Sequence, residues 1–484
     1  MNRAMTRSGL PTLIILTTIT ALLQLQFPVL GVADDLEDSV EGVISPLIES
    51  GERVGIAVGV VYGGVWRSFG YGEEIEGSGT GPDENTIYQI ASTTKTFTAI
   101  LLSDMVKRGE VGLDDPLGLY LPVAIPSLGG RNITLLDLAT HTSGLPPIPA
   151  NFEPDDELNP YADYSMEMMY EFLEDCTLSY IPGHQYQYSN LGVALLGYAL
   201  ELAAGKPYEE LIIERICRPL GMYGTLFELD PGHAAMLAQG YWSELNGSLT
   251  PPSFVHEAVP AWDTGVFSPA GGLYSSVHDM LAYIAANLGS TGMEISSAME
   301  ITQTSCREAY PSMDICLGWH RTTRDGAQVL MHHGATFGFN SNLLFSRDEG
   351  IGVVLLSNTY VPESDSLDEA GFEILQILRE RECMSNYRKL LDAHASFRET
   401  HISEMGSLNR TCNSLVTENS DLMVDIDELE SALENLNASR ETLLLDKIEL
   451  DEKLREARNL VNILTIAMVA SAVFSILVVL RRRG

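Results

Sequence analysis

The chain has 484 residues, which a prior of about 150 residues per domain divides into some three units. Hydrophobic residues make up 45% of it, enough for a sizeable core, so general disorder is excluded. The 66 acidic residues outnumber the 29 basic ones and give a net charge of −37, a surface that repels phosphate backbones and argues against nucleic-acid binding. Six cysteines are too few for a disulfide scaffold.

The first 33 residues have the order of a secretory signal. Arg3 and Arg7 precede an apolar run from Leu10 to Leu30, and small residues at 31–33 offer a cleavage site. An uncleaved anchor is the alternative, but two glutamines and a proline inside the run weaken it as a membrane span. We therefore expect residues 1–33 to be removed as a signal peptide.

Residues 34–395 have the pattern of an α+β head. Strand-like segments stand near both ends, and helical segments mixed with Pro- and Gly-rich loops stand between them. In chain order we expect a helix over 35–50, strands over 54–61 and 65–71 joined by Gly63-Gly64, a helix over 96–107 ending at Gly109, strands over 328–332, 339–345 and 351–357, and a helix over 365–389. This order indicates one antiparallel sheet with an inserted helical subdomain. Within it, Cys306 and Cys316 could form a disulfide or remain buried free thiols.

The only Ser-x-x-Lys of the chain is formed by Ser92 and Lys95. Positions i and i+3 share a helix face, so the lysine amine can lie beside the serine hydroxyl. Burial lowers the pKa of a lysine, and a neutral Lys95 could take the proton that keeps a serine weakly nucleophilic. Alone the motif is weak, because about one instance is expected by chance. Its structural interpretation is a helix cap followed by a surface lysine.

Tyr188 and Asn190 form a second element, two residues apart. From an extended loop their side chains project the same way, so Tyr188 could relay a proton to a leaving group while Asn190 holds a substrate carbonyl. Without the Ser-x-x-Lys motif, a tyrosine packed at a helix start would be the better interpretation of Tyr188.

The third element is the segment from His332 to Ala335, at the end of a strand-like run. Gly334 there lets the backbone pass close to a ligand. The amides of Ser92 and Ala335 could form an oxyanion hole, which stabilises the charge of an acyl-transfer transition state. A structural histidine is an equally good interpretation of His332 in isolation.

In this order, the three elements resemble the serine β-lactamases and penicillin-recognising hydrolases. The likeness is strongest to the class C branch, with its D-alanyl-D-alanine carboxypeptidases, esterases and D-aminopeptidases. It spans about residues 36–380 and includes the segments 90–97, 113–116, 141–145, 188–192, 219–222, 270–275 and 338–341. The resemblance implies the fold of that family and a serine hydrolase that needs no cofactor. No histidine spacing indicates a metal site.

The resemblance also implies a role for each candidate residue. Ser92 would be the acylated nucleophile, Lys95 its base or proton relay, and Tyr188 the partner base and acid. Asn190 would orient the substrate amide. His332 stands where many members have a lysine that grips a substrate carboxylate, and a neutral imidazole supplies no full charge at pH 7. We therefore expect the substrate to be an ester or an amide without an essential carboxylate rather than a β-lactam or a D-Ala peptide.

Residues 396–459 have the heptad pattern of a coiled-coil stalk. Leucines recur at every seventh position, at Leu408, Leu415, Leu422, Leu429, Leu436, Leu443 and Leu450. They occupy the d positions, and the polar residues Asn419, Arg440 and Lys447 at a positions favour two parallel strands. The alternative is a single amphipathic helix, but the unbroken heptads argue against it. We expect a parallel homodimer.

Residues 460–480 are predominantly apolar and long enough to cross a hydrocarbon core of about 30 Å. Three arginines follow and place the tail, 481–484, in the cytoplasm. We therefore expect a single-pass protein of the cell membrane whose head acts outside the cytoplasm on a small-molecule or peptide substrate, through an acyl-enzyme on Ser92. The alternative is a catalytically silent head that binds or senses a ligand on a dimeric stalk.

Overall fold

The computed structural model describes residues 35–248, 253–289 and 295–416. The expected signal peptide, the heptads beyond residue 416 and the apolar segment 460–480 lie outside these residues. Within them, no helix combines the length and the hydropathy that a membrane span requires.

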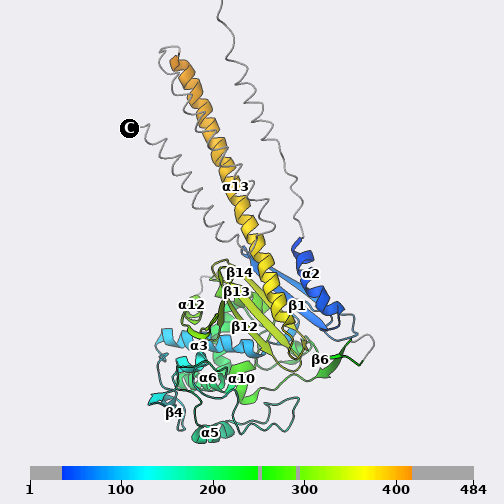
Figure 1. The fold of residues 1–484 in the computed structure, drawn as a ribbon, viewed down its shortest axis with the longest axis vertical. Helices are drawn as coiled ribbons and strands as arrows, with labels where there is room; N and C mark the ends of the chain where they lie inside the picture. The colour runs from blue at the N-terminus through cyan, green and yellow to red at the C-terminus, as the bar shows by residue number, and fades with distance from the viewer. Residues whose placement is uncertain (1–34, 249–252, 290–294, 417–484) are drawn as a thin grey trace, which may run out of the picture.

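An eight-stranded sheet forms the middle layer of the head, with the strand order β2-β1-β14-β13-β12-β11-β10-β9 (Figure 1). All neighbouring pairs in it are antiparallel. The strands are β1 (Gly55–Tyr62), β2 (Val65–Gly72), β9 (Arg307–Tyr310), β10 (Met313–Ile315), β11 (His320–Arg324), β12 (Ala327–Ala335), β13 (Asn340–Ser346) and β14 (Ile351–Ser357). The five strands expected from the sequence are confirmed, and so is a large antiparallel sheet in an α+β head, although three small sheets stand beside it.

The β1–β2 connection shows why the sequence predicted a hairpin. Tyr62 pairs with Val65, so only Gly63 and Gly64 make the turn. Their φ angles of 54° and 77° lie in the left-handed region, which glycine adopts without the penalty that a Cβ brings.

Two helices cover one face of the sheet, α2 (Asp35–Glu49) and α13 (Ser366–Val416), and they contact each other (Figure 1). Their apolar side chains form a core with β1, β12, β13 and β14 that includes Val40, Ile44, Val58, Val353, Ile374 and Leu378. The sequence predicted a last helix ending at residue 389, but α13 continues to Val416. It has no proline in its 51 residues, so nothing in its backbone chemistry stops it.

The other face carries the larger core and the helical subdomain. The helix α11 (Val277–Asn287) packs directly on this face, because glycines in β1 and β14 leave room for it. A Cβ on Gly59 would lie 2.8 Å from the Val277 side chain, and one on Gly352 would lie 2.4 Å from the Ile284 side chain. The remaining helices are α3 (Thr94–Arg108), α4 (Leu135–Ala139), α5 (Met166–Asp175), α6 (Asn190–Ala204), α7 (Tyr208–Ile212), α8 (Arg218–Leu220), α9 (Pro231–Ala234), α10 (Ser268–Gly271) and α12 (Ser296–Thr304), with a π-helical turn at Ile213–Cys217 and 3-10 turns at Ala91–Thr93, Leu117–Leu119 and Gly265–Phe267.

Three small sheets complete the fold. They are β3 (Ile87–Gln89) with β8 (Tyr274–Ser276), β4 (Ser127–Leu128) with β5 (Arg131–Asn132), and the three-stranded β15 (Thr359–Tyr360), β6 (Gly240–Asn246) and β7 (Ser253–Val259). The β3–β8 pair matters for function, because β3 leads directly into the segment that carries Ser92.

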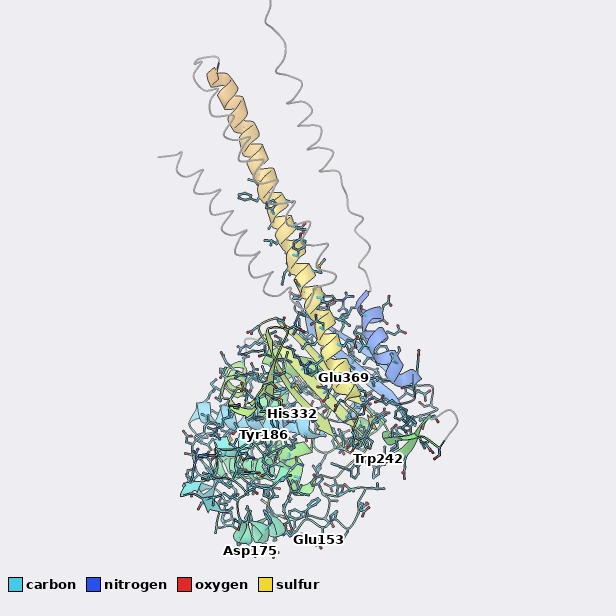
Figure 2. All side chains as sticks on the ribbon, in the orientation of Figure 1. Glu153, Asp175, Tyr186, Trp242, His332 and Glu369 are labelled. Carbon is cyan, nitrogen blue, oxygen red and sulfur yellow. A yellow bond between two sulfur atoms is a disulfide. The ribbon has the colours of Figure 1, made fainter. Side chains whose placement is uncertain are left out.

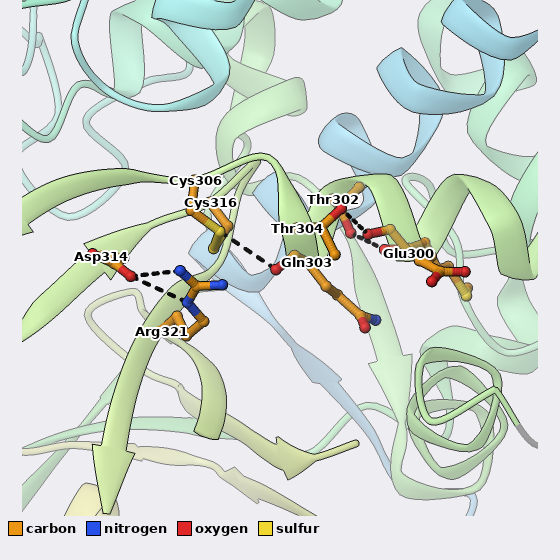
Figure 3. Close-up of a disulfide and its surroundings, with 9 residues drawn as sticks. Glu300, Thr302, Gln303, Thr304, Cys306, Asp314, Cys316 and Arg321 are labelled. Carbon is orange, nitrogen blue, oxygen red and sulfur yellow. Dashed lines mark hydrogen bonds and ion pairs between the residues drawn. A yellow bond between two sulfur atoms is a disulfide. The ribbon is translucent and has the colours of Figure 1, made fainter. Parts of the chain in front are cut away.

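Cys306 and Cys316 form a disulfide, so of the two alternatives left open by the sequence the structure has the bonded one (Figure 3). The bond closes the β9–β10 hairpin at its base. Next to it, Arg321 of β11 binds Asp314 of β10 at 2.6 Å. Three cysteines of the described residues are free thiols: Cys176, Cys217 and Cys383.

Candidate active site

Ser92 lies in the 3-10 turn between β3 and α3, and the turn is tied to the main sheet. Ser341 of β13 donates from Oγ to the Ile90 carbonyl at 2.7 Å, and its Oγ lies 2.8 Å from Thr93 Oγ1. Ala91 has a φ of 46°, which a side chain with a Cβ adopts only under constraint from its surroundings. The turn therefore holds Ser92 in a defined, strained position at the start of α3.

Lys95 meets the serine as the three-residue spacing predicted. Its Nζ donates to Ser92 Oγ at 2.9 Å and to the Ala270 carbonyl of α10 at 2.6 Å. Its side chain is 1% exposed. Burial lowers the pKa of Lys95 well below its usual range, because the charged form loses its hydration. Lys95 can thus be neutral at physiological pH and accept a proton from Ser92.

Tyr188 completes this group. Its ring centroid lies 4.9 Å from Lys95 Nζ, and its hydroxyl is hydrogen-bonded to Ser92. Burial raises the pKa of Tyr188 strongly, and the bond to Ser92 only partly offsets that effect. The phenol therefore keeps its proton, which makes it a proton donor rather than a base in the free protein.

His141 supports Tyr188 from behind. The two ring centroids are 4.5 Å apart, and His141 Nδ1 accepts a hydrogen bond from the Ser189 amide at 3.2 Å. Ser189 in turn caps α6, accepting from the Gly192 amide at 2.9 Å. His141 is buried, and burial lowers its pKa well below the usual range. Its contacts are those of a support for the Tyr188 loop.

Asn190 is the first residue of α6, and Tyr161 holds it. Its Nδ2 donates to Tyr161 Oη at 3.2 Å, and its Oδ1 is buried without a partner among the described residues. Rotating the amide by 180° would let Tyr161 donate to Oδ1 and leave Nδ2 to donate to a substrate carbonyl. The amide is thus oriented by one protein contact and has one end left for a ligand.

The end of β12 approaches the Ser92 turn edge-on. The neighbouring strand β11 pairs with β12 only up to Met331, so the segment from His332 to Ala335 faces the turn rather than a strand on that side. Gly334 is the closest point: a Cβ there would lie 2.3 Å from the Ile90 carbonyl oxygen and 2.8 Å from the Ser92 nitrogen. Only glycine fits, and the backbone at Ala335 is brought beside the backbone of Ser92.

His332 is buried and neutral. Its Nδ1 donates to the His333 carbonyl at 2.7 Å, while Nε2 has no partner among the described residues. Burial lowers the pKa of His332 well below its usual range, because the imidazolium loses its hydration. The Tyr186 hydroxyl lies 2.8 Å from His320 Nε2, and the rings of His320 and His332 are 5.7 Å apart. Tyr186 and His332 lie in the middle of the head (Figure 2). No full positive charge stands at the position where a lysine would grip a carboxylate.

The structure thus gathers five of the candidates around the Ser92 turn: Ser92, Lys95, Tyr188, His332 and Gly334. Ala335 follows Gly334 in β12, and Asn190 follows Tyr188 by two residues at the start of α6. Sequence reasoning missed the roles of Ser341 and Tyr161. Ser341 lies in the segment 338–341, whose resemblance to the family could have marked it as a candidate site residue. For Tyr161, no local pattern places a tyrosine of the helical subdomain on Asn190. Among the described residues no group of His, Cys, Asp and Glu has the arrangement of a metal site.

Comparison with known proteins agrees with this geometry. The family model described as Beta-lactamase matches residues 40–376, more than half of the chain. The chain is 33% identical over 276 residues to the D-alanyl-D-alanine-carboxypeptidase/endopeptidase AmpH of Escherichia coli K12, covering 55% of this chain and 66% of that protein, just under two thirds of its length.

Two further relatives show the same likeness. A Beta-lactamase of Pseudomonas fluorescens is 24% identical over 371 residues, covering 70% of this chain and 98% of that protein. The Unguisins hydrolase ungD' of Aspergillus campestris is 28% identical over 343 residues, covering 67% of this chain and 62% of that protein. With the family model spanning residues 40–376 and the Ser92–Lys95–Tyr188 group assembled, this chain belongs to the β-lactamase family of serine hydrolases.

Proposed function

We propose that this protein is a serine hydrolase that cleaves an amide or ester bond through an acyl-enzyme on Ser92. The observation that carries the proposal is the contact of Lys95 Nζ with Ser92 Oγ at 2.9 Å, inside a site that lowers the pKa of the lysine. A merely structural lysine gains nothing from burial without a carboxylate partner, since desolvation of its charge costs free energy.

The geometry supports a defined proton path. Lys95 takes the Ser92 proton as Oγ attacks the substrate carbonyl, and the carbonyl electrons move onto the oxygen beside the Ser92 and Ala335 amides. When the tetrahedral intermediate collapses, the bond to the leaving group breaks and Tyr188 donates its proton to that group. Lys95 then returns the proton to Tyr188, and water hydrolyses the ester of Ser92 by the reverse path.

Substrate choice follows from the neutral His332. Two relatives carry the names β-lactamase and D-alanyl-D-alanine-carboxypeptidase, and such substrates bear a carboxylate. A buried, uncharged imidazole offers that carboxylate at most a hydrogen bond. We therefore infer a substrate whose binding does not depend on a carboxylate, an ester or a neutral amide, ahead of β-lactams and D-Ala peptides.

A labelling experiment tests the mechanism. The full-length protein, extracted in detergent, is treated with a fluorophosphonate probe and then assayed with p-nitrophenyl acetate and a chromogenic cephalosporin. Ser92→Ala should lose both labelling and turnover, whereas Ser103→Ala, a buried serine of α3 outside the site, should keep them. A Ser92→Ala variant that still turned over the ester would refute the mechanism. A folded wild-type protein that took no label would favour the silent binding or sensing head instead.

We further propose that the head is displayed outside the cytoplasm as a parallel dimer, tethered through residues 460–480. An exposed stripe on α13 supports the dimer. Met384, Tyr387 and Leu391 are 48%, 39% and 49% exposed. Met384 and Leu391 lie 35 and 28 residues before Asn419, an a position, and Tyr387 lies 21 residues before Leu408, a d position. Because these separations are multiples of seven, the three residues continue the a and d positions of the heptads that follow. A seam that begins beside the head would cover them.

Mass measurement of the detergent-extracted protein tests the dimer. Leu391→Glu places a charge at an a position and should weaken association, whereas Lys389→Glu changes an outward f position and should not. A wild-type monomer at micromolar concentration would contradict the dimer. Removal of residues 460–484 should release the protein from the membrane fraction, and retention there would contradict the tether.

A further inference from the structure

The Tyr188 loop, residues 183–189, belongs to the helical subdomain, and most of its hydrogen bonds stay there. The Gln187 amide donates to the His141 carbonyl at 2.7 Å, and the Ser189 hydroxyl donates to the Pro146 carbonyl at 2.6 Å. The Ser92 turn, in contrast, is tied to the eight-stranded sheet through Ser341 of β13. The approach of Tyr188 to Ser92 therefore depends on how the loop is held against the sheet.

One hydrogen bond of the described residues joins this loop to the eight-stranded sheet. Tyr186 Oη lies 2.8 Å from Nε2 of His320, the first residue of β11. Tyr186 is half-buried and His320 is 7% exposed. Since little water reaches such a site, the loss of one partner leaves the other without a full replacement.

His320 is itself fixed beside the catalytic residues. Gly318, two residues earlier, has a φ of 71°, and a Cβ there would lie 2.8 Å from the Lys95 carbonyl oxygen. His320 pairs with Met331 of β12, and its ring lies 5.7 Å from that of His332. The position of His320 is therefore set by α3, which carries Lys95, and by β12, which carries His332.

Tyr186 and Tyr188 are two residues apart in an extended segment, so their side chains project to the same side. The Tyr186 ring lies 5.9 Å from that of His320, and the Tyr188 ring lies 6.5 Å from that of His332. The first pair is hydrogen-bonded to each other, whereas the Tyr188 hydroxyl bonds to Ser92. The bond at Tyr186 therefore leaves the neighbouring hydroxyl little freedom to move away from the nucleophile.

We propose that Tyr186 and His320 are positioning residues, whose hydrogen bond holds the Tyr188 hydroxyl where it donates a proton to the leaving group. This inference rests on the proposed function and adds two residues to its mechanism. No hydrogen bond of the described residues joins Tyr186 or His320 to Ser92, so both act through Tyr188. Loss of their bond should slow the step in which the leaving group takes the proton, because that transfer requires a well-placed donor.

Two esters that give the same acetyl-enzyme test this role on the full-length protein. They are p-nitrophenyl acetate, whose leaving group departs readily without a proton, and phenyl acetate, whose more basic leaving group needs one. Tyr186→Phe removes only the hydroxyl. Its kcat/KM should fall about tenfold for phenyl acetate and less than about threefold for p-nitrophenyl acetate, since a complete general acid contributes roughly 10²–10⁴. A general disturbance of the Ser92 turn would instead lower both values together.

Variants of His320 remove the same bond from the other side. His320→Leu should repeat the selective loss for phenyl acetate, and His320→Gln, whose amide can bond to Tyr186, should recover most of it. The double variant Tyr186→Phe, His320→Leu should lose no more than either single variant. Tyr120→Phe is the matched control, because it removes a hydroxyl that donates to Asp115 at 2.6 Å, and it should keep both wild-type values.

The outcomes separate this inference from the proposed function. Turnover that depends on Ser92, but with no loss or with equal losses for the two esters in Tyr186→Phe and His320→Leu, would overturn the positioning role and spare the proposed function. A loss in His320→Gln as large as that in His320→Leu would also overturn it. No turnover of either ester by the folded wild type would overturn both.

Discussion

The contact between β12 and the nucleophile turn predicts a large effect for one added methyl group. In Gly334→Ala the new Cβ would lie 2.3 Å from the Ile90 carbonyl oxygen, 2.7 Å from Ser341 Oγ and 2.8 Å from the Ser92 nitrogen. Ordinary contact begins at 3.4 Å, so the strand and the turn must separate by about 1 Å. Two of the three atoms belong to backbone and cannot rotate away.

That separation acts on catalysis more than on folding. A misplacement of about 1 Å can cost roughly 100-fold in rate, because the attacking oxygen and the oxyanion donors leave their common geometry. Overpacking should cost about 1–3 kcal/mol in the free energy of unfolding. We therefore expect Gly334→Ala to fold with a lowered melting temperature and to lose about 100-fold in kcat for p-nitrophenyl acetate.

The assay pairs steady-state kinetics with thermal melting. Gly42→Ala, in α2, is the matched control, because a Cβ there meets nothing within 4 Å. It should keep wild-type kcat. A folded Gly334→Ala protein with kcat within about threefold of the wild type would refute the close approach of β12 to the turn, and with it the assignment of an oxyanion hole between them.

Three further predictions concern titration and covalent structure. Lys95→Met should lower the rate of fluorophosphonate labelling by about 10²–10⁴, the usual contribution of a general base, and an unchanged rate would exclude Lys95 as the base. Burial lowers the pKa of His320 from 6.5 to about 4. Between these two pH values the unfolded chain binds a proton at His320 that the folded protein does not bind. The free energy of unfolding should therefore fall by about 3 kcal/mol as the pH drops from 6.5 to 4. The melting temperature should depend less on pH in His320→Gln than in the wild type over that range. An equal pH dependence in the two proteins would contradict the lowered pKa of His320. Replacing Cys306 and Cys316 by alanine should cost about 2–3 kcal/mol in urea unfolding, whereas Cys176→Ala should cost less, and equal costs would argue against the disulfide.

Local patterns predicted the strands that are both long and apolar. β1 and β14 are almost fully buried and consist of small and branched apolar residues, so their type could be recognised without their partners. The strands β9, β10 and β11 were missed, because they are short and partly exposed and contain charged residues. Pairing with neighbours stabilises them, and the Cys306–Cys316 bond closes the first hairpin, so their own composition does not mark them as strands.

The candidate site divides in the same way. The spacing of Ser92 and Lys95 along the chain predicted a hydroxyl beside an amine, and the structure has that contact at 2.9 Å. The contact of Tyr161 with Asn190 had no such signal, since the two residues are distant in sequence and meet only in the folded helical subdomain.

The sequence by itself determined the family and predicted Ser92 and Lys95 as the catalytic pair, because both depend on short spacings that the backbone geometry preserves. Only the tertiary structure decided how strongly Lys95 is desolvated. Burial lowers the pKa of Lys95 well below its usual range, and the groups that bury it, such as the Ala270 carbonyl, are far away in the chain. The free energy of desolvation is a property of that packing, so no local pattern contains it.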